Sequence, residues 1–148
     1  MCSLSSEKIA TAASSIGICG QKRGLMRALV VEDSNTIRMI LCRYLREMNI
    51  QVVEAANGRQ ALDRLEEMSP PDLVLVDWDM PVMSGIDFIR AVRDLHVYDP
   101  LPLIMVTTHS ESEYLSTARE AGANEYIQKP CTLEALREKL DLLGLLKT

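Results

Sequence analysis

The sequence has no long hydrophobic run and no excess of basic residues. No stretch approaches the roughly 18 apolar residues that a membrane-spanning helix needs. The net charge is -5 and the sequence pI is about 5.1. Broad binding to nucleic acids or anionic membranes needs a basic face. We therefore expect neither nucleic acid nor a membrane among the partners of this protein.

Cysteine and histidine are few, and neither type is grouped. The cysteines are Cys2, Cys19, Cys42 and Cys131, and the histidines are His96 and His109. Because the chain has no C-x-x-C pair and no histidine between its cysteines, a zinc site and a disulfide framework are both disfavoured. Reduced thiols in the cytoplasm are the simplest interpretation.

Residues 1–25 are mostly small and polar, and they are not typical of a signal peptide. They lack a basic first region, because Glu7 precedes Lys8, and serines and glycines interrupt their apolar residues. We expect residues 1–25 to be a flexible N-terminal extension. We expect residues 26–148 to form one domain, and the protein to be cytoplasmic.

From residue 26 onward, short apolar runs alternate with stretches of helical periodicity. The predicted strands are residues 28–31, 51–54, 73–77, 103–107 and 125–128. A helix-like pattern follows each of them, so we predict five helices. Five strand–helix units with short connections predict an α/β fold with a parallel sheet and helices on both faces.

Helix ends can also be predicted from local signals. Asn57 with Gln60 three residues later indicates a capping box, and Ser110 with Glu113 has the same spacing. The helix that Ser110 opens would end at Gly122, because glycine accepts the backbone conformation common after a helix.

Polar side chains gather where the predicted strands end. In chain order they are Glu32, Asp33, Asp77, Asp79, Thr107, Thr108, His109 and Lys129. Ligands of open α/β sheets bind beyond the carboxyl ends of the strands. Three acids from two strands would meet there and repel one another unless a cation lies between them. Oxygen ligands alone favour a hard ion, above all Mg²⁺.

The same arrangement suggests phosphoryl transfer. With Mg²⁺, the charge of Lys129 and the hydroxyl of Thr107 would form a clamp for an oxyanion around Asp77. By attacking phosphorus, Asp77 would become an acyl phosphate. Each residue alone is more typical of a helix cap or a solvated loop. Their joint placement on four strands carries the hypothesis.

Four motifs resemble the receiver domain of two-component response regulators. They are Val30-Val31-Glu32-Asp33-Ser34, Asp77-x-x-Met80-Pro81-x-x-x-Gly85, Val106-Thr107 and Lys129-Pro130. The match covers about residues 26 to 143 in the order and spacing of the family. Because the chain stops after the fifth helix, we expect a stand-alone, CheY-like receiver. The resemblance implies a flavodoxin-like, doubly wound sheet with strand order 2-1-3-4-5 flanked by five helices.

The resemblance also implies how the acids act. Asp77 would be the phosphorylation site. Asp33 and Asp77 would hold Mg²⁺ directly, together with the backbone carbonyl of Asp79, and Glu32 would act through water. Asp79 would also place a second negative charge beside the phosphoryl group, which would modulate the rate of dephosphorylation.

Other positions are implied to bind the phosphoryl group or to respond to it. Lys129 would bind the phosphoryl group, and its peptide bond to Pro130 is commonly cis in the family. Thr107 would move to meet the phosphoryl group while Tyr126 swings inward.

Three further residues are expected near the phosphorylation site: two that would modulate its chemistry and one whose fluorescence would report on it. Thr108 would narrow access to the site. His109 would touch the phosphoryl group or its attacking water, although a solvent-facing loop histidine is the commoner arrangement. Because side chains alternate along a strand, we expect the ring of Trp78 outside the acid pocket but close to it.

We expect the protein to be a phosphorylation-activated switch, and not an enzyme beyond promoting its own phosphorylation and dephosphorylation. A histidine kinase or phosphotransfer protein would supply the phosphoryl group. An unknown downstream protein would read the face formed by the fourth helix, fifth strand and fifth helix, and chemotaxis is one candidate pathway. We expect a monomer or a weak dimer.

Two alternatives remain open. The first is a Mg²⁺-dependent phosphatase of the haloacid dehalogenase type, with Asp77 as nucleophile and Asp79 as acid and base. In that family the D-x-D motif is usually on the first strand and is followed by a hydroxyl residue, whereas Met80 and Pro81 follow here on the third. The second is a receiver that works without phosphorylation, which the complete acid set and Lys129 disfavour.

Overall fold

The computed structural model describes residues 26–109 and 111–146, so the predicted extension 1–25 lies outside the described residues. The strands are β1 (Arg27–Val31), β2 (Gln51–Ala55), β3 (Leu73–Asp77), β4 (Leu103–Thr107) and β5 (Glu125–Gln128). The α-helices are α3 (Asn35–Glu47), α4 (Gly58–Glu67), α5 (Gly85–Asp94), α6 (Ser112–Ala121) and α7 (Leu133–Leu142). A short 3₁₀ helix, η2 (His96–Tyr98), follows α5. All five predicted strands are present, and the first two are one residue longer than predicted.

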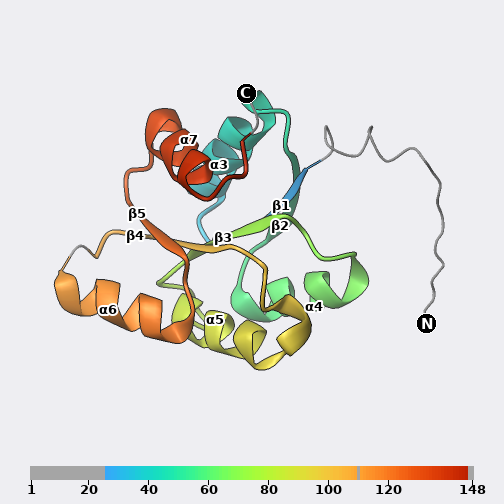
Figure 1. Ribbon diagram of the computed structural model, residues 1–148, viewed down its shortest axis with the longest axis vertical. Coiled ribbons are helices and arrows are strands. Elements are labelled where there is room, and N and C mark those ends of the chain that lie inside the picture. Colours follow the sequence, from blue (N-terminus) through green and yellow to red (C-terminus); the bar gives the residue numbers. More distant parts are fainter. Residues whose placement is uncertain (1–25, 110, 147–148) are drawn as a thin grey trace.

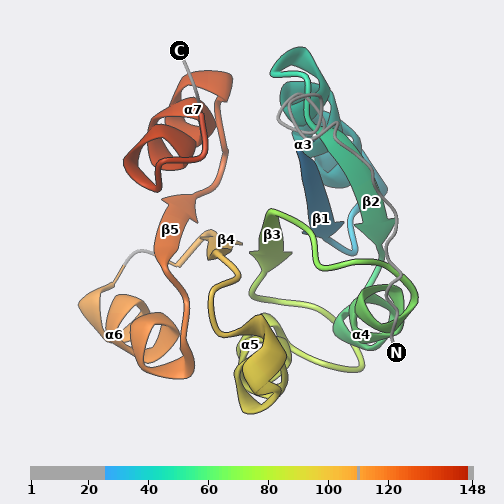
Figure 2. The same ribbon diagram turned by 45° about the vertical axis from the view of Figure 1, so that its right-hand side comes forward.

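The five strands form one parallel sheet in the order β2-β1-β3-β4-β5. Helices α3 and α7 cover one face, and α4, α5 and α6 cover the other (Figures 1 and 2). The predicted flavodoxin-like fold and its strand order are therefore confirmed. No helix in the described part of the chain is long and apolar enough to cross a membrane.

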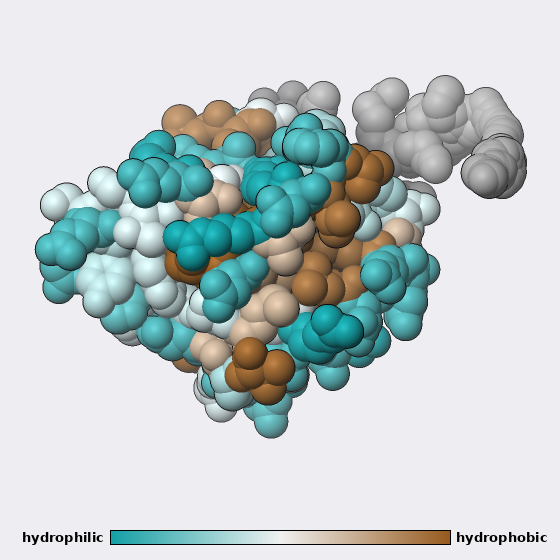
Figure 3. Space-filling view, turned by 90° about the horizontal axis from the view of Figure 1, so that it is seen from below, coloured by the Kyte–Doolittle hydropathy of each residue, from teal (hydrophilic) through white to brown (hydrophobic). Residues whose placement is uncertain are grey.

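Helices on both faces explain the uninterrupted apolar runs of the central strands. Along β3, Leu73 and Leu75 belong to the hydrophobic cluster under α3 and α7, whereas Val74 and Val76 belong to the cluster on the opposite face. Every residue of β3 and β4 is buried. Strands covered on both faces need apolar side chains in both directions. The outer surface of the α4–α5–α6 layer is mostly hydrophilic, with hydrophobic side chains exposed between the polar ones (Figure 3).

The predicted caps are only partly confirmed. The Asn57 side chain accepts a hydrogen bond from the backbone N–H of Gln60 at 2.8 Å. The Gln60 side chain accepts from the N–H of Ala56 at 2.7 Å, one residue before the expected partner. A reciprocal cap therefore holds the start of α4 with a small shift in register.

Ser110, the predicted cap of the helix after β4, lies outside the described residues. Helix α6 begins at Ser112, its N-cap is Glu111, and Glu111 makes no side-chain cap bond. Directly after β4, the His109 N–H donates to Thr107 Oγ1 at 3.1 Å. The predicted end is confirmed, since Gly122 caps α6 with a φ of 121°.

Arg93 on α5 forms hydrogen bonds at the amino-terminal ends of β4 and β5, opposite the end of the sheet that carries the acids. Its guanidinium donates to the backbone oxygens of Gly122, Tyr98, Asp99 and Leu101 and to the side chain of Asn124. Asn124 Oδ1 also accepts from the N–H of Leu103 at the start of β4. One side chain thus ties α5 and two connecting loops to the sheet.

Candidate functional site

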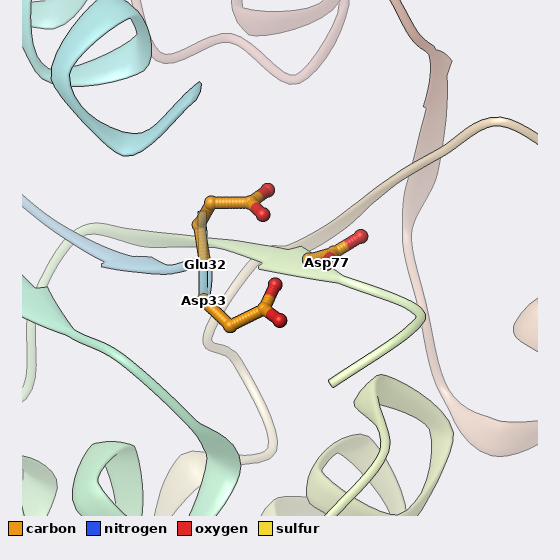
Figure 4. Close-up of side chains that lie close together, drawn as sticks. All are labelled: Glu32, Asp33 and Asp77. Carbon is orange, nitrogen blue, oxygen red and sulfur yellow. The ribbon is translucent and has the colours of Figure 1, made fainter. Parts of the chain in front are cut away.

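Three carboxylates meet where β1 and β3 lie side by side. Glu32 and Asp33 directly follow β1, and Asp77 is the last residue of β3. One oxygen from each carboxylate lies within 4.8 Å of the other two, and Figure 4 shows the three side chains at the ends of these neighbouring strands. The strand order changes direction between β1 and β3. Open α/β sheets bind their ligands at this position, beyond the carboxyl ends of the strands.

Lys129 is the cation that compensates these acids. Its Nζ lies 2.9 Å from Asp77 Oδ1 and donates a hydrogen bond to it. The same Nζ lies 3.1 Å from Glu32 Oε1, at ion-pair distance but without hydrogen-bond geometry, so this buried oxygen has no hydrogen-bond partner. Asp77 and Glu32 are only 4% and 1% exposed. Buried carboxylates of this kind are costly unless they are paired.

The backbone around the acids is closely supported. Glu32 Oε2 accepts from the N–H of Ser34 at 3.2 Å, and Arg38 on α3 donates to the Glu32 carbonyl oxygen at 2.7 Å. Gly85 packs against the backbone of Asp77 so closely that a Cβ there would overlap the Asp77 carbonyl oxygen. These contacts fix the positions of both buried acids.

Burial and charge shift the proton affinities of the site. Burial, assisted by Asp77 and opposed by Lys129, raises the pKa of Glu32 from 4.5 to about 7. Burial also raises the pKa of Asp77, although the hydrogen bond and charge of Lys129 oppose it. Burial alone would lower the pKa of Lys129, but its contacts with Asp77 and Glu32 raise it above its ordinary value. One lysine faces three acids, so the site favours a further cation.

The three acids fit a hard metal ion. Their donors are carboxylate oxygens, which Mg²⁺ prefers to thiolate or imidazole. Glu32 Oε1 is buried with no hydrogen bond, so it has lone pairs available for a metal-bound water. The carboxylate of Asp79 lies outside this group, because it pairs with His109 at 3.1 Å. The predicted role of its backbone carbonyl stays a prediction.

The proposed switch residues and their neighbours lie at the ends of β4 and β5. Thr107 is fully buried, and its carbonyl oxygen accepts from the N–H of Lys129 at 2.7 Å. Thr108 is exposed and, with Lys129 and Cys131, lines a groove of about 370 Å³ against α3. The hydroxyl of Tyr126 is buried without a hydrogen-bond partner, and its ring packs against the core cluster under α4, α5 and α6. The Lys129–Pro130 peptide bond is cis, as the resemblance implied.

His109 is not the solvent-facing loop residue that sequence reasoning favoured. Its side chain is 28% exposed and its Nε2 lies 3.1 Å from Asp79 Oδ2. Its ring stacks on Tyr114, with 4.1 Å between centroids, and Trp78 meets both rings edge-on. Sequence reasoning missed Tyr114, and no spacing rule could have found it, because the contact depends on the conformation of the loop between β4 and α6.

Val82, in the loop after β3, has an unusual backbone conformation. Its φ is 73°, and its side chain is 82% exposed. A β-branched side chain is strained in the left-handed region. No sequence signal indicated this, because Pro81 before it is compatible with several turns.

Residues 28–141 match the family Response regulator receiver domain. The chemotaxis protein CheY homolog of Campylobacter jejuni is 40% identical over 121 residues, which cover 80% of this chain and 93% of that protein. Chemotaxis protein CheY1 of Helicobacter pylori is 37% identical over 119 residues, which cover 80% and 96%. Among solved structures, the chemotaxis response regulator CheY4 of Vibrio cholerae matches with a TM-score of 0.75 and 32% identity, covering 80% of this chain and 98% of that one.

Proposed function

The chain belongs to the response regulator receiver domain family, and on that premise we propose that it is a phosphorylation-activated switch with Asp77 as the phosphoacceptor. The observation that carries this proposal is the 2.9 Å contact between Lys129 Nζ and Asp77 Oδ1 beside the acids Glu32 and Asp33. Asp77 is the member of the group that combines burial, a lysine partner and the end of a central strand.

In the proposed reaction, an oxygen of Asp77 bonds to phosphorus while the bond from phosphorus to the donor breaks. Lys129 stays within reach of the transferred oxygens, and Thr107 offers its hydroxyl from the neighbouring strand end. Asp33 and Asp77 would hold Mg²⁺ directly, with the Asp79 carbonyl, and Glu32 would act through water. Mg²⁺, when bound, would neutralise charge on the phosphoryl oxygens.

We propose that the signal leaves through Thr107 and Tyr126. If Thr107 moves toward the phosphoryl group, space opens for the Tyr126 ring, whose hydroxyl is buried without a partner in the present arrangement. A buried unpartnered hydroxyl is unfavourable, so a second ring position in which the hydroxyl gains a partner would be favoured. The affected surface would be α6, β5 and α7, where a downstream protein would bind.

The relatives are named as chemotaxis proteins, and we propose chemotaxis signalling as the pathway. A histidine kinase or phosphotransfer protein would supply the phosphoryl group in the cytoplasm, and the chain would act as a monomer or weak dimer. Receiver domains of this kind are signalling proteins and not classical enzymes. Dephosphorylation assisted by its own site residues would be its only hydrolytic activity.

The phosphatase alternative has less support. It requires Asp79 to exchange a proton at the reacting centre, but the Asp79 carboxylate is 67% exposed and pairs with His109. The family match also includes the third-strand position of Asp77.

Mass spectrometry after incubation with acetyl phosphate and Mg²⁺ tests the proposal. Wild-type protein should gain one phosphoryl group, and Asp77→Asn should gain none. Asp63→Asn, which changes an exposed carboxylate on α4, is the matched control and should be labelled like wild type. Labelling of the Asp77→Asn variant would show that the phosphoacceptor is another residue.

A further inference from the structure

Trp78, His109 and Tyr114 form a three-ring cluster beside the proposed phosphorylation site. His109 and Tyr114 are stacked with an interplanar angle of 4° and a centroid distance of 4.1 Å. Trp78 meets His109 at 5.5 Å and Tyr114 at 5.0 Å, each at 72°. The rings come from the loop after β3, the loop after β4 and the first turn of α6. The cluster therefore joins three segments that surround the carboxyl ends of β3 and β4.

The cluster is connected to Thr107 through the backbone of His109. The His109 N–H donates to Thr107 Oγ1 at 3.1 Å. The His109 ring is held by Tyr114, by Trp78 and by Asp79, whose Oδ2 lies 3.1 Å from Nε2. If Thr107 moves toward Asp77, it must either lose this hydrogen bond or draw His109 away from its ring partners.

We propose that Tyr114 is a positioning residue that, by stacking on His109, holds Thr107 in the arrangement seen here and so opposes its closure on a phosphoryl group at Asp77. The proposal rests on the proposed function of Asp77. Contacts present in only one of two conformations shift the equilibrium toward that conformation by their own free energy. Tyr114 would therefore reduce the fraction of molecules ready to bind a phosphoryl group.

Tyr114 also affects Tyr126 electrostatically. Tyr126, the other proposed switch residue, has its pKa raised by burial and then by the nearby Glu111 and Tyr114. Tyr114 thus stacks on the residue bonded to Thr107 and also influences the proton affinity of the tyrosine that would respond to Thr107. The position of Tyr114 would couple the two proposed movements.

The expected effect follows from the strength of aromatic contacts. Pairs of this geometry change an equilibrium constant by roughly 2- to 12-fold. Tyr114→Ala should therefore bind beryllofluoride, a phosphoryl mimic, about 2- to 12-fold more tightly than wild type in the presence of Mg²⁺. Tyr114→Phe keeps the stacked ring and should bind like wild type. Isothermal titration calorimetry on the full chain measures both affinities.

A double-mutant cycle separates positioning from general loosening of the fold. His109→Ala removes the ring on which Tyr114 stacks and should tighten beryllofluoride binding in the same way. In the His109→Ala background, Tyr114→Ala should add less than half of its effect in wild type, because the two changes break the same contact. If Tyr114→Ala does not fold, Tyr114→Leu, which removes the ring but keeps apolar volume, carries the same expectation.

The results of these experiments distinguish failure of the Tyr114 role from failure of the proposed function. Unchanged or weaker binding by Tyr114→Ala or Tyr114→Leu, with wild type binding normally, would overturn the positioning role and leave Asp77 as phosphoacceptor. Fully additive effects of the two substitutions would also overturn it. Absence of beryllofluoride binding by wild type with Mg²⁺ would overturn the proposed function itself, and the role of Tyr114 with it.

Discussion

The ammonium group of Lys129 lies 2.9 Å from Asp77 Oδ1, across 52 residues of sequence. The proposed phosphoacceptor therefore has a cationic partner within the folded chain. A phosphoryl group on Asp77 would keep Lys129 as its neighbour, so one residue stabilises the carboxylate before the reaction and the phosphoryl oxygens after it. The stability of the folded protein and the proposed phosphorylation of Asp77 therefore depend on the same lysine.

Lys129→Met should destabilise the metal-free protein. It leaves Asp77 and Glu32 buried without their cation, which costs roughly 3 kcal/mol of unfolding free energy at pH 8. The loss should be smaller at pH 5, where protonation of Glu32 removes one uncompensated charge. Urea denaturation measures both values. Lys139→Met breaks the partly exposed pair with Glu125 and should cost less than about 1 kcal/mol. Equal losses for the two variants would contradict this prediction.

Glu32→Gln should change the pH dependence of stability. The pKa of Glu32 is raised from 4.5 to about 7, so between these values the folded protein binds more protons than the unfolded chain. The free energy of unfolding should therefore fall as pH rises from about 4.5 through 7, and the variant should lose this component.

The expected difference between wild type and Glu32→Gln is about 1 to 3 kcal/mol between pH 4.5 and 8. Denaturation at several pH values without Mg²⁺ measures it. Glu47→Gln, at an exposed position on α3, should keep the wild-type pH profile. A Glu32→Gln profile parallel to wild type would show that the raised pKa is wrong.

Trp78 should report metal binding. It is the only tryptophan, follows Asp77 directly and is half-buried against His109 and Tyr114. Mg²⁺ should change its fluorescence with saturation at one site, and the affinity should weaken as pH falls below 7 and Glu32 protonates. The response should vanish in Asp33→Ala and persist in Asp63→Asn. A response that survives Asp33→Ala would refute the proposed coordination.

Tyr126→Ala should prevent a phosphoryl mimic at Asp77 from changing the α6–β5–α7 face. NMR amide shifts on beryllofluoride addition should persist around Asp77 but shrink on α7. Tyr126→Phe is the control and should respond like wild type. It should also be more stable by up to about 1 kcal/mol, because it removes a hydroxyl that is buried without a partner. Full α7 shifts in Tyr126→Ala would place the signal elsewhere.

Val82→Gly should stabilise the protein by about 1 kcal/mol, because glycine tolerates a φ of 73° without strain. Thermal or urea unfolding tests this expectation. Val97→Gly is the matched control, since Val97 is also exposed but has no positive φ, and it should lose stability. A destabilised Val82→Gly would show that the exposed valine makes a favourable contact.

Much of the fold could be predicted because its signals are local. The run at residues 73–76 is apolar throughout, because β3 is covered on both faces. The gathering of Asp33, Asp77 and Lys129 at one edge followed from the predicted parallel sheet, because the carboxyl ends of parallel strands lie at the same edge. Strand order needed the family resemblance, because adjacency in a sheet is not encoded locally.

The rest depended on loop conformation and long-range contacts. The pairing of Asp79 with His109 and the stacking of His109 on Tyr114 arise from two loops that meet only in the folded chain. Helix α6 begins at Ser112 with Glu111 as its N-cap, a start that the spacing of Ser110 and Glu113 did not predict. The five bonds of Arg93 likewise join groups separated by up to 31 residues.

The hydrogen bonds of Arg93 also determine which substitutions the loops before β4 and β5 tolerate. One guanidinium holds the amino-terminal ends of β4 and β5 through backbone oxygens, which any sequence supplies. Apart from Asn124, whose side chain accepts from Arg93 and from the Leu103 N–H, side chains in those loops can vary without removing these bonds. Arg93 itself cannot be exchanged for lysine without losing donors. Substitutions at the carboxyl ends of the strands, where the acids lie, therefore leave this anchor at the opposite end of the sheet intact.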